Sequence, residues 1–177
     1  MKYSLVISVL VILSSAPQAE QYSWNYMDIG FSEDGLGSGP TFSVASHVAG
    51  NLFARANIFR NQQQISTQPI NSLFSFYTAG YQYRLLFIEA GVSQYEVCWY
   101  ACASYTGNVA MLGLVGGSGK FKAKISAGAL DLMAQEWLVI EADANYAVND
   151  HWGISLGVMD LDELAGNVTK LGVRMTW

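Results

Sequence analysis

The chain has 177 residues, of which 51% are hydrophobic and only 13% are charged. Beyond the N-terminus no apolar run approaches the roughly 18 residues that a membrane-spanning helix needs, so a helical membrane protein is excluded. The formal net charge of −5 excludes nucleic-acid binding, which needs a basic field to displace counterions. Frequent glycine, with 17 residues, and 15 Tyr and Trp residues favour a single all-β domain.

Residues 1–19 have the features of a secretory signal peptide. Lys2 gives a positive end, Leu5 to Leu13 forms an apolar core, and small residues follow up to Ala19. Cleavage after Ala19 is favoured over cleavage after Ala16, and it leaves residues 20–177 as the mature domain. Loss of Lys2 leaves eight basic residues against 14 acidic ones, a net charge of −6. No cysteine stands directly after the apolar core, which excludes a lipoprotein anchor.

From Tyr22 onward the chain divides into alternating segments of about ten residues, the length of a strand that crosses a membrane in a barrel. Alternation places apolar side chains on one face of each strand and polar ones on the other. Only the segment at 104–115 has an ambiguous facing, because glycine and apolar residues occur on both of its stripes. The predicted strands lie at about 22–32, 40–48, 52–58, 72–83, 85–96, 104–115, 121–128, 138–145, 152–158 and 168–177.

An even number of strands allows the first and last to close a barrel. Ten strands satisfy this condition, and eight are the alternative if the first and sixth are misread. Four short turns are predicted on the periplasmic side and longer loops on the outer side. The short turns are Ala49–Asn51, Tyr83–Leu85, Gly116–Gly119 and Val148–Asp150. The polar stretch Asn61–Gln68, which precedes Pro69, is predicted to be the longest loop.

The last strand carries an apolar stripe and ends on an aromatic residue. Leu171, Val173, Met175 and Trp177 alternate with the polar stripe that contains Lys170, Gly172, Arg174 and Thr176. This pattern resembles the C-terminal strand of bacterial outer-membrane β-barrel proteins, in which such residues are recognised by the barrel-assembly machinery. We therefore expect lipid, rather than a protein core, against the apolar stripe.

Together with the signal peptide and the short turns, this strand makes residues 20–177 resemble the small porin-like and OmpA/OmpX/OmpW-type outer-membrane barrels. The resemblance implies a closed antiparallel transmembrane β-barrel in the outer membrane of a Gram-negative cell. It also implies contact with outer-membrane lipid and lipopolysaccharide, assembly by the barrel-assembly machinery, and a monomer.

The polar stripes place charges of both signs inside the predicted barrel. If the strands at 121–128 and 138–145 pair about the turn at 132–137, Lys124 lies opposite Asp143 and Ser126 opposite Glu141, which predicts a direct Lys124–Asp143 ion pair. Because buried charges need partners, a filled polar plug is favoured over a narrow path for water, ions or small solutes. The inward set is Asp28, His47, Arg55, Glu89, Lys122, Lys124, Glu141, Asp143, Lys170 and Arg174.

Neither histidine has the position that an enzyme of this class needs. Barrel enzymes that modify lipid A, and omptin-type proteases, place a histidine near the outer rim, whereas His47 and His151 are both predicted on the periplasmic side. No catalytic residue and no cofactor is therefore predicted.

Cys98 and Cys102 are predicted to form a disulfide after export, fixing an outer loop tip that carries Trp99 and Tyr100. Interfacial anchoring is favoured for these aromatic residues over adhesion. The motif Asp160-Leu-Asp-Glu163 could hold a divalent cation, but it lacks a full ligand set, so a solvated acidic rim is favoured and no metal site is predicted. The sequence thus predicts a structural or narrow-pore barrel, with an adhesion barrel and a lipid-A-modifying enzyme as alternatives.

Overall fold

The computed structural model describes residues 22–34, 37–65, 68–161 and 167–177. The predicted signal peptide, and Asp162 and Glu163 of the acidic motif, lie outside these residues. No helix among the described residues is long and apolar enough to cross a membrane. The described chain forms ten strands: β1 (Tyr26–Asp34), β2 (Gly37–Ala49), β3 (Leu52–Ile65), β4 (Gln68–Tyr83), β5 (Leu86–Cys98), β6 (Cys102–Ser118), β7 (Phe121–Leu132), β8 (Gln135–Ala147), β9 (Trp152–Asp160) and β10 (Asn167–Thr176).

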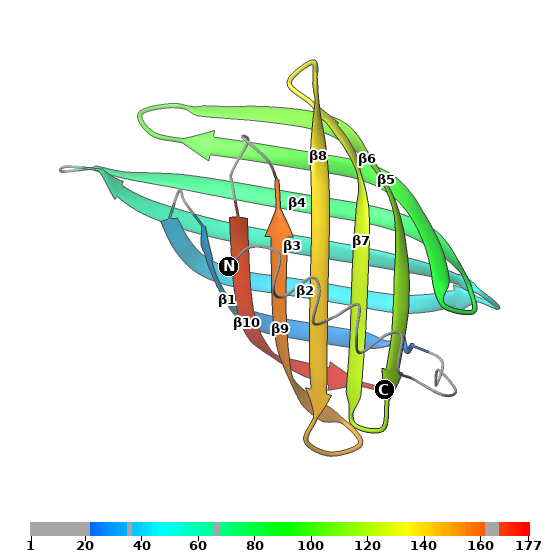
Figure 1. Cartoon of the computed structure of the whole chain (residues 1–177). Helices are drawn as coiled ribbons and strands as arrows, with labels where there is room; N and C mark the ends of the chain where they lie inside the picture. The colour runs from blue at the N-terminus through cyan, green and yellow to red at the C-terminus, as the bar shows by residue number, and fades with distance from the viewer. Residues whose placement is uncertain (1–21, 35–36, 66–67, 162–166) are drawn as a thin grey trace.

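The ten strands close into one antiparallel barrel (Figure 1). Each strand pairs with its neighbours in the chain, and β1 pairs with β10 along a register that runs from Tyr26 opposite Thr176 to Glu33 opposite Thr169. Closure pairs the first and last strands, which would otherwise be open edges in the membrane. The predicted fold class is confirmed, and the eight-strand alternative is excluded.

The outward stripes form an apolar belt around the barrel. Leu112 and Leu171, on opposite sides of the strand order, are both 59% exposed, and Ile88 and Ile154 are similarly open. A ring of polar residues borders the belt at one end: Glu33, Arg60, Gln94, Asn108, Asp131, Glu136 and Asp160. Exposed tyrosine and tryptophan residues border it at the other: Tyr81, Tyr83, Tyr146, Trp152 and Trp177. Apolar belts with aromatic borders are typical of barrels that lie in lipid.

The two ends of the barrel differ in their connections. At one end, which we call the turn end, lie the β2–β3, β4–β5, β6–β7 and β8–β9 hairpins together with Tyr26 and Thr176. We call the opposite end the far end. The N-terminal and C-terminal sides of the described barrel therefore meet at the turn end.

The prediction of a long loop at Asn61–Gln68 is wrong. Here β3 continues to Ile65 and β4 begins at Gln68, and the two strands pair from Asn61 opposite Ser72 to Ile65 opposite Gln68. The sequence Asn-Gln-Gln-Gln at 61–64 is polar at every position, so the ladder continues without an alternating pattern. The β7–β8 connection is likewise only Met133 and Ala134. In these two hairpins, long strands rather than long loops thus extend the far end.

Candidate functional site: the layered lumen

Inward side chains fill the lumen in three layers along the barrel axis. An aromatic layer lies at the turn end, made of Tyr22, Trp24, Tyr26, Ala45, Phe53, Phe87 and Val115. Next to it, towards the far end, lies a charged layer. On β3, for example, the inward-facing Arg55 lies between Phe53 of the aromatic layer and Phe59 of the third layer. The third layer, towards the far end, is apolar and contains Phe59, Phe74, Phe76, Val109, Met111, Leu130, Leu132, Val139, Met159, Leu161 and Val168.

The segment Tyr22–Asn25 precedes β1 and contributes to the aromatic layer. Trp24 is fully buried and stacks on Phe53, with ring centroids 3.7 Å apart and planes 2° apart. Its indole Nε1 donates a hydrogen bond to Gln82 Oε1 at 2.5 Å. The sequence predicted a strand from residue 22, but the strand starts at Tyr26, because the residues before it turn inward to fill the barrel mouth.

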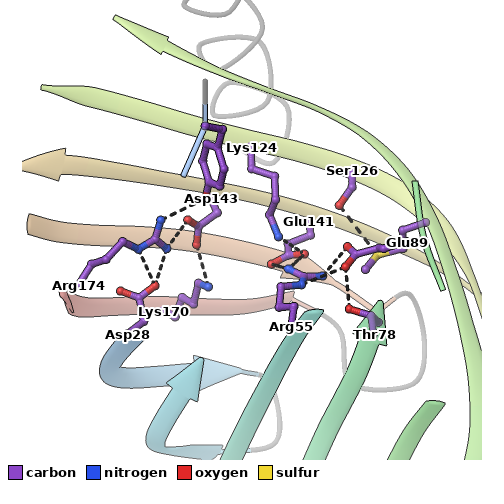
Figure 2. A network of polar contacts seen from close by, with 12 residues as sticks. Asp28, Arg55, Thr78, Glu89, Lys124, Ser126, Glu141, Asp143, Lys170 and Arg174 are labelled. Carbon is purple, nitrogen blue, oxygen red and sulfur yellow. Dashed lines mark hydrogen bonds and ion pairs between the residues drawn. The ribbon is translucent and has the colours of Figure 1, made fainter. Parts of the chain in front are cut away.

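The first half of the charged layer is built around Arg55 (Figure 2). Its guanidinium donates to Glu89 Oε1 at 2.6 Å and to Glu141 Oε2 at 2.8 Å. Lys124 Nζ lies 2.8 Å from Glu141 Oε2, and Thr78 Oγ1 donates to Glu89 Oε2 at 2.7 Å. Arg55, Lys124, Glu89 and Glu141 together have no net charge, and we call them the Arg55 quartet.

The second half is built around Arg174 on the closing strand β10. Its guanidinium is paired with Asp28 on β1 and donates to Asp143 Oδ1 on β8 at 2.7 Å. Lys170 Nζ lies 2.7 Å from Asp143 Oδ2. Arg174 also donates to the Tyr22 hydroxyl at 3.2 Å. Arg174, Lys170, Asp28 and Asp143 also sum to zero charge, and we call them the Arg174 quartet.

The space for Lys170 depends on a glycine. Gly157 is its cross-strand partner, and a Cβ at Gly157 would lie 2.2 Å from Lys170 Cε. A larger residue at position 157 would therefore displace the ammonium group from Asp143.

Every charged member of the two quartets is at most 9% exposed. Withdrawing such charges from water costs several kcal/mol for each ion, so they are tolerated only because each meets opposite charge at hydrogen-bonding distance. The two neutral sets join six of the ten strands around the barrel interior: β1, β3, β5, β7, β8 and β10.

The structure brings eight of the nine charged residues proposed for the lumen network into these quartets. The ninth, Lys122, lies half-buried on the inward stripe of β7, closer to the turn end. The predicted register, with Lys124 opposite Asp143 and Ser126 opposite Glu141, is confirmed. The predicted direct Lys124–Asp143 ion pair is wrong, since Lys124 reaches the diagonal neighbour Glu141 and Asp143 is bound by Lys170 and Arg174. Long side chains commonly reach diagonal positions in a sheet.

Sequence reasoning missed the apolar layer towards the far end. The signal for it was the strand at 104–115, whose apolar residues fall on both stripes: Val109 and Met111 face inward and are 2% exposed, whereas Leu112 faces outward. An ambiguous alternation in a barrel strand can therefore indicate an apolar lumen rather than a misread strand.

The remaining candidate residues lie outside the lumen network. Cys98 and Cys102 form a disulfide. Glu96 lies near both sulfur atoms in the spacing of a metal site, but bonded sulfurs offer no thiolate ligands. His47 lies on β2 near the turn end, and His151 is exposed in the β8–β9 connection. The two histidines are thus both at the turn end, as the sequence predicted.

The similarity to one solved structure supports the architecture. The fold is similar to the translocator domain of the autotransporter NalP from Neisseria meningitidis, with 11% identity and a TM-score of 0.50 over 98% of this chain and 95% of that one. A de novo designed transmembrane β-barrel matches with 12% identity and a TM-score of 0.44 over 89% of this chain and 99% of the design. A porin matches with 13% identity and a TM-score of 0.38 over 89% of this chain and 60% of the porin. No protein-family model and no curated protein sequence matches the chain.

The fold defines the class of protein. A closed antiparallel ten-strand barrel with an apolar outer belt, similar over nearly its whole length to the NalP translocator domain, has the fold of a transmembrane β-barrel. These similarities do not distinguish the OmpA, OmpX or OmpW type that the sequence pattern resembles.

Proposed function

We propose that the protein is a structural outer-membrane barrel whose lumen is a closed plug and does not conduct. The observation that carries this proposal is the order of the lumen layers: two neutral charge quartets enclosed between an aromatic layer and an apolar layer. Charged side chains alone would also suit a narrow pore. Their enclosure by apolar layers on both sides favours the plug.

The apolar layers are barriers to ions. An ion that enters from either end must leave its water among phenyl, indole and aliphatic side chains, and stripping an ion of water in such surroundings costs far more than thermal energy. The quartets offer it no compensating charge, because their members are already paired.

The outer belt gives the proposed location and partners. Outer-membrane lipid and lipopolysaccharide would contact the belt, and the alternating stripe that contains Leu171, Val173, Met175 and Trp177 would be recognised by the barrel-assembly machinery. Leu171, Val173 and Trp177 are more than half exposed on the outer face, as such recognition requires. Since both ends of the described barrel lie at the turn end, that end would face the periplasm.

We further propose that the barrel has no catalytic activity. Both histidines lie at the turn end, far along the strands from the polar border where an enzyme that acts on outer-leaflet lipid would need a general base. The adhesion alternative is supported mainly by the exposed Trp99 and Tyr100 at the disulfide-closed tip of the β5–β6 hairpin.

Single-channel recording in planar lipid bilayers tests the plug. The refolded barrel should give no conductance steps above those of detergent alone, whereas a porin added to the same bilayer should give clear ones. Reproducible steps from the barrel would exclude the plug and support the narrow pore. Mass spectrometry of lipid A from cells with and without the protein tests catalysis, and identical spectra are expected.

A further inference from the structure

One strand of the barrel carries an open edge beyond the polar border of the belt. Strand β6 pairs with β5 from Cys102, opposite Cys98, to Leu114, opposite Leu86. Its pairing with β7 begins only at Asn108, opposite Asp131. Gly107 also lies against the β7 backbone at Asp131 and Leu132. Residues 102–106 of β6 therefore have a second edge with which no described residue pairs. In Figure 1 the β5–β6 hairpin runs to the left while the β7–β8 hairpin points upward, so the two hairpins diverge here.

The backbone groups of this edge can be assigned from one hydrogen bond. Val115 N–H donates to the Leu85 carbonyl at 2.8 Å, so odd-numbered β6 residues exchange hydrogen bonds with β5. Antiparallel partners alternate between bonded and non-bonded pairs, and the β5–β6 register is unbroken down to Cys102. The N–H and C=O groups of Ser104 and Thr106 therefore point away from β5, towards the open edge.

The edge lacks the features by which proteins usually prevent pairing. Open edges are commonly protected by lysine, proline or a bulge, but the sequence of residues 102–106 is Cys-Ala-Ser-Tyr-Thr. Cys102, Ser104, Tyr105 and Thr106 are all exposed. An uncharged, regular edge of about five residues is long enough to accept another strand.

The side chains next to the edge indicate what such a strand would carry. On the inner face an aromatic row crosses four strands, from Phe59 through Phe74 and Tyr95 to Tyr105. The row ends at the open edge, where Tyr105 is 37% exposed. On the outer face, Asp131 and Glu136 lie opposite each other and are exposed. Asp131 pairs with Asn108, the residue at which the β6–β7 ladder begins next to the open edge. An apolar side chain would extend the aromatic row, and a basic one would meet the two carboxylates.

We propose that the open edge of β6 binds an extended segment of another polypeptide by β-strand addition, with apolar side chains facing Tyr105 and basic ones facing Asp131 and Glu136. A second copy of this chain fits less well. Two barrels in one membrane are related by an axis along the membrane normal, and their strands are tilted by roughly 35–45°, so the two β6 edges would cross instead of pairing.

A peptide-binding experiment on the full barrel in detergent micelles tests the proposal. The probe is a fluorescent ten-residue peptide of alternating valine and lysine, and its control has proline in place of alternate valines, with the same charge. We expect the first peptide to bind, measured by fluorescence anisotropy, and the control to bind at least about tenfold more weakly, because it cannot form the ladder. Equal binding of the two peptides would show adsorption by charge alone and overturn the proposal.

Variants locate the site. Ser104→Pro and Thr106→Pro remove edge N–H groups without removing a hydrogen bond to β5, so each should fold, shown by the heat-dependent shift in gel mobility, and bind the peptide about tenfold more weakly. Ser104→Ala and Thr106→Ala are the matched controls and should bind as the wild type does, since the contact is made by the backbone. Unchanged binding by the folded proline variants would overturn the proposal. A wild-type dimer that Thr106→Pro converts to a monomer would do so as well, in favour of a second copy.

Discussion

Removing the cation at the centre of the Arg55 quartet should destabilise the barrel strongly. Arg55→Met leaves Glu89 and Glu141 buried with only Lys124 to balance them. Breaking a buried ion pair from one side costs about 3–5 kcal/mol, because it leaves an uncompensated charge. Arg55 donates to both carboxylates, so the free energy of unfolding should fall by an amount in this range.

A second substitution should reverse much of this loss. Adding Glu89→Gln makes the remaining set neutral, with Lys124 against Glu141, and the new amide oxygen can still accept from Thr78. The double variant should therefore be more stable than Arg55→Met alone, by about 2 kcal/mol, a typical coupling between buried charges in direct contact. Arg60→Met is the matched control on the same strand, because Arg60 is exposed, and it should change stability by no more than about 0.5 kcal/mol.

These free energies can be measured by equilibrium unfolding in urea, with the barrel in lipid vesicles and tryptophan fluorescence as the signal. The reasoning fails if the loss of stability in the double variant equals the sum of the losses in Arg55→Met and Glu89→Gln alone, since the charges would then act independently. It also fails if Arg55→Met and Arg60→Met lose equal stability.

Three further variants test other parts of the structure by the same unfolding assay. Trp24→Ala should cost about 3–5 kcal/mol, as expected for a fully buried ring, and a loss below about 1 kcal/mol would show that the segment before β1 does not plug the barrel. Met133 and Ala134 have φ angles of 56° and 58°, which suit Asn-Gly in a two-residue hairpin, so replacing them by Asn and Gly should stabilise the barrel by about 1–2 kcal/mol; a loss of stability would contradict the turn assignment. Leu112→Arg, in the middle of the belt, should cost about 2–4 kcal/mol, and a neutral effect would argue against lipid on that face.

The facing of the strands could be predicted from sequence because a sheet in lipid has a strict period of two. Every other residue of a strand faces lipid and must be apolar, so apolar residues such as Ile154 and Leu171 show which face of their strand is the outer one. The β7–β8 register, in which Lys124 lies opposite Asp143, could be predicted from this alternation together with the position of the turn at 132–137. A shift by one residue would turn lysine and aspartate into lipid, which the pattern excludes.

The strand ends could not be predicted, because that constraint ends at the belt. Residues 61–64 of β3, Asn-Gln-Gln-Gln, are polar at every position and pair with β4, and such a sequence does not distinguish a strand from a loop. The partners in the ion pairs could not be predicted from the sequence either. The register gives only which Cα atoms lie opposite one another. Whether Lys124 pairs with Glu141 or with Asp143 depends on the direction of its side chain. It also depends on Arg174, a residue distant in the sequence that binds Asp143.

The most direct test of the account is the solvent at Leu112. A nitroxide spin label attached at Leu112→Cys, in barrels reconstituted into phospholipid vesicles, reports its accessibility to oxygen, which concentrates in lipid, and to a nickel chelate, which stays in water. We predict high accessibility to oxygen and little to nickel at this position, with the reverse at Asp131→Cys on the polar border. Ready access of the nickel chelate to the label at position 112 would contradict the claim that the outer belt lies in lipid.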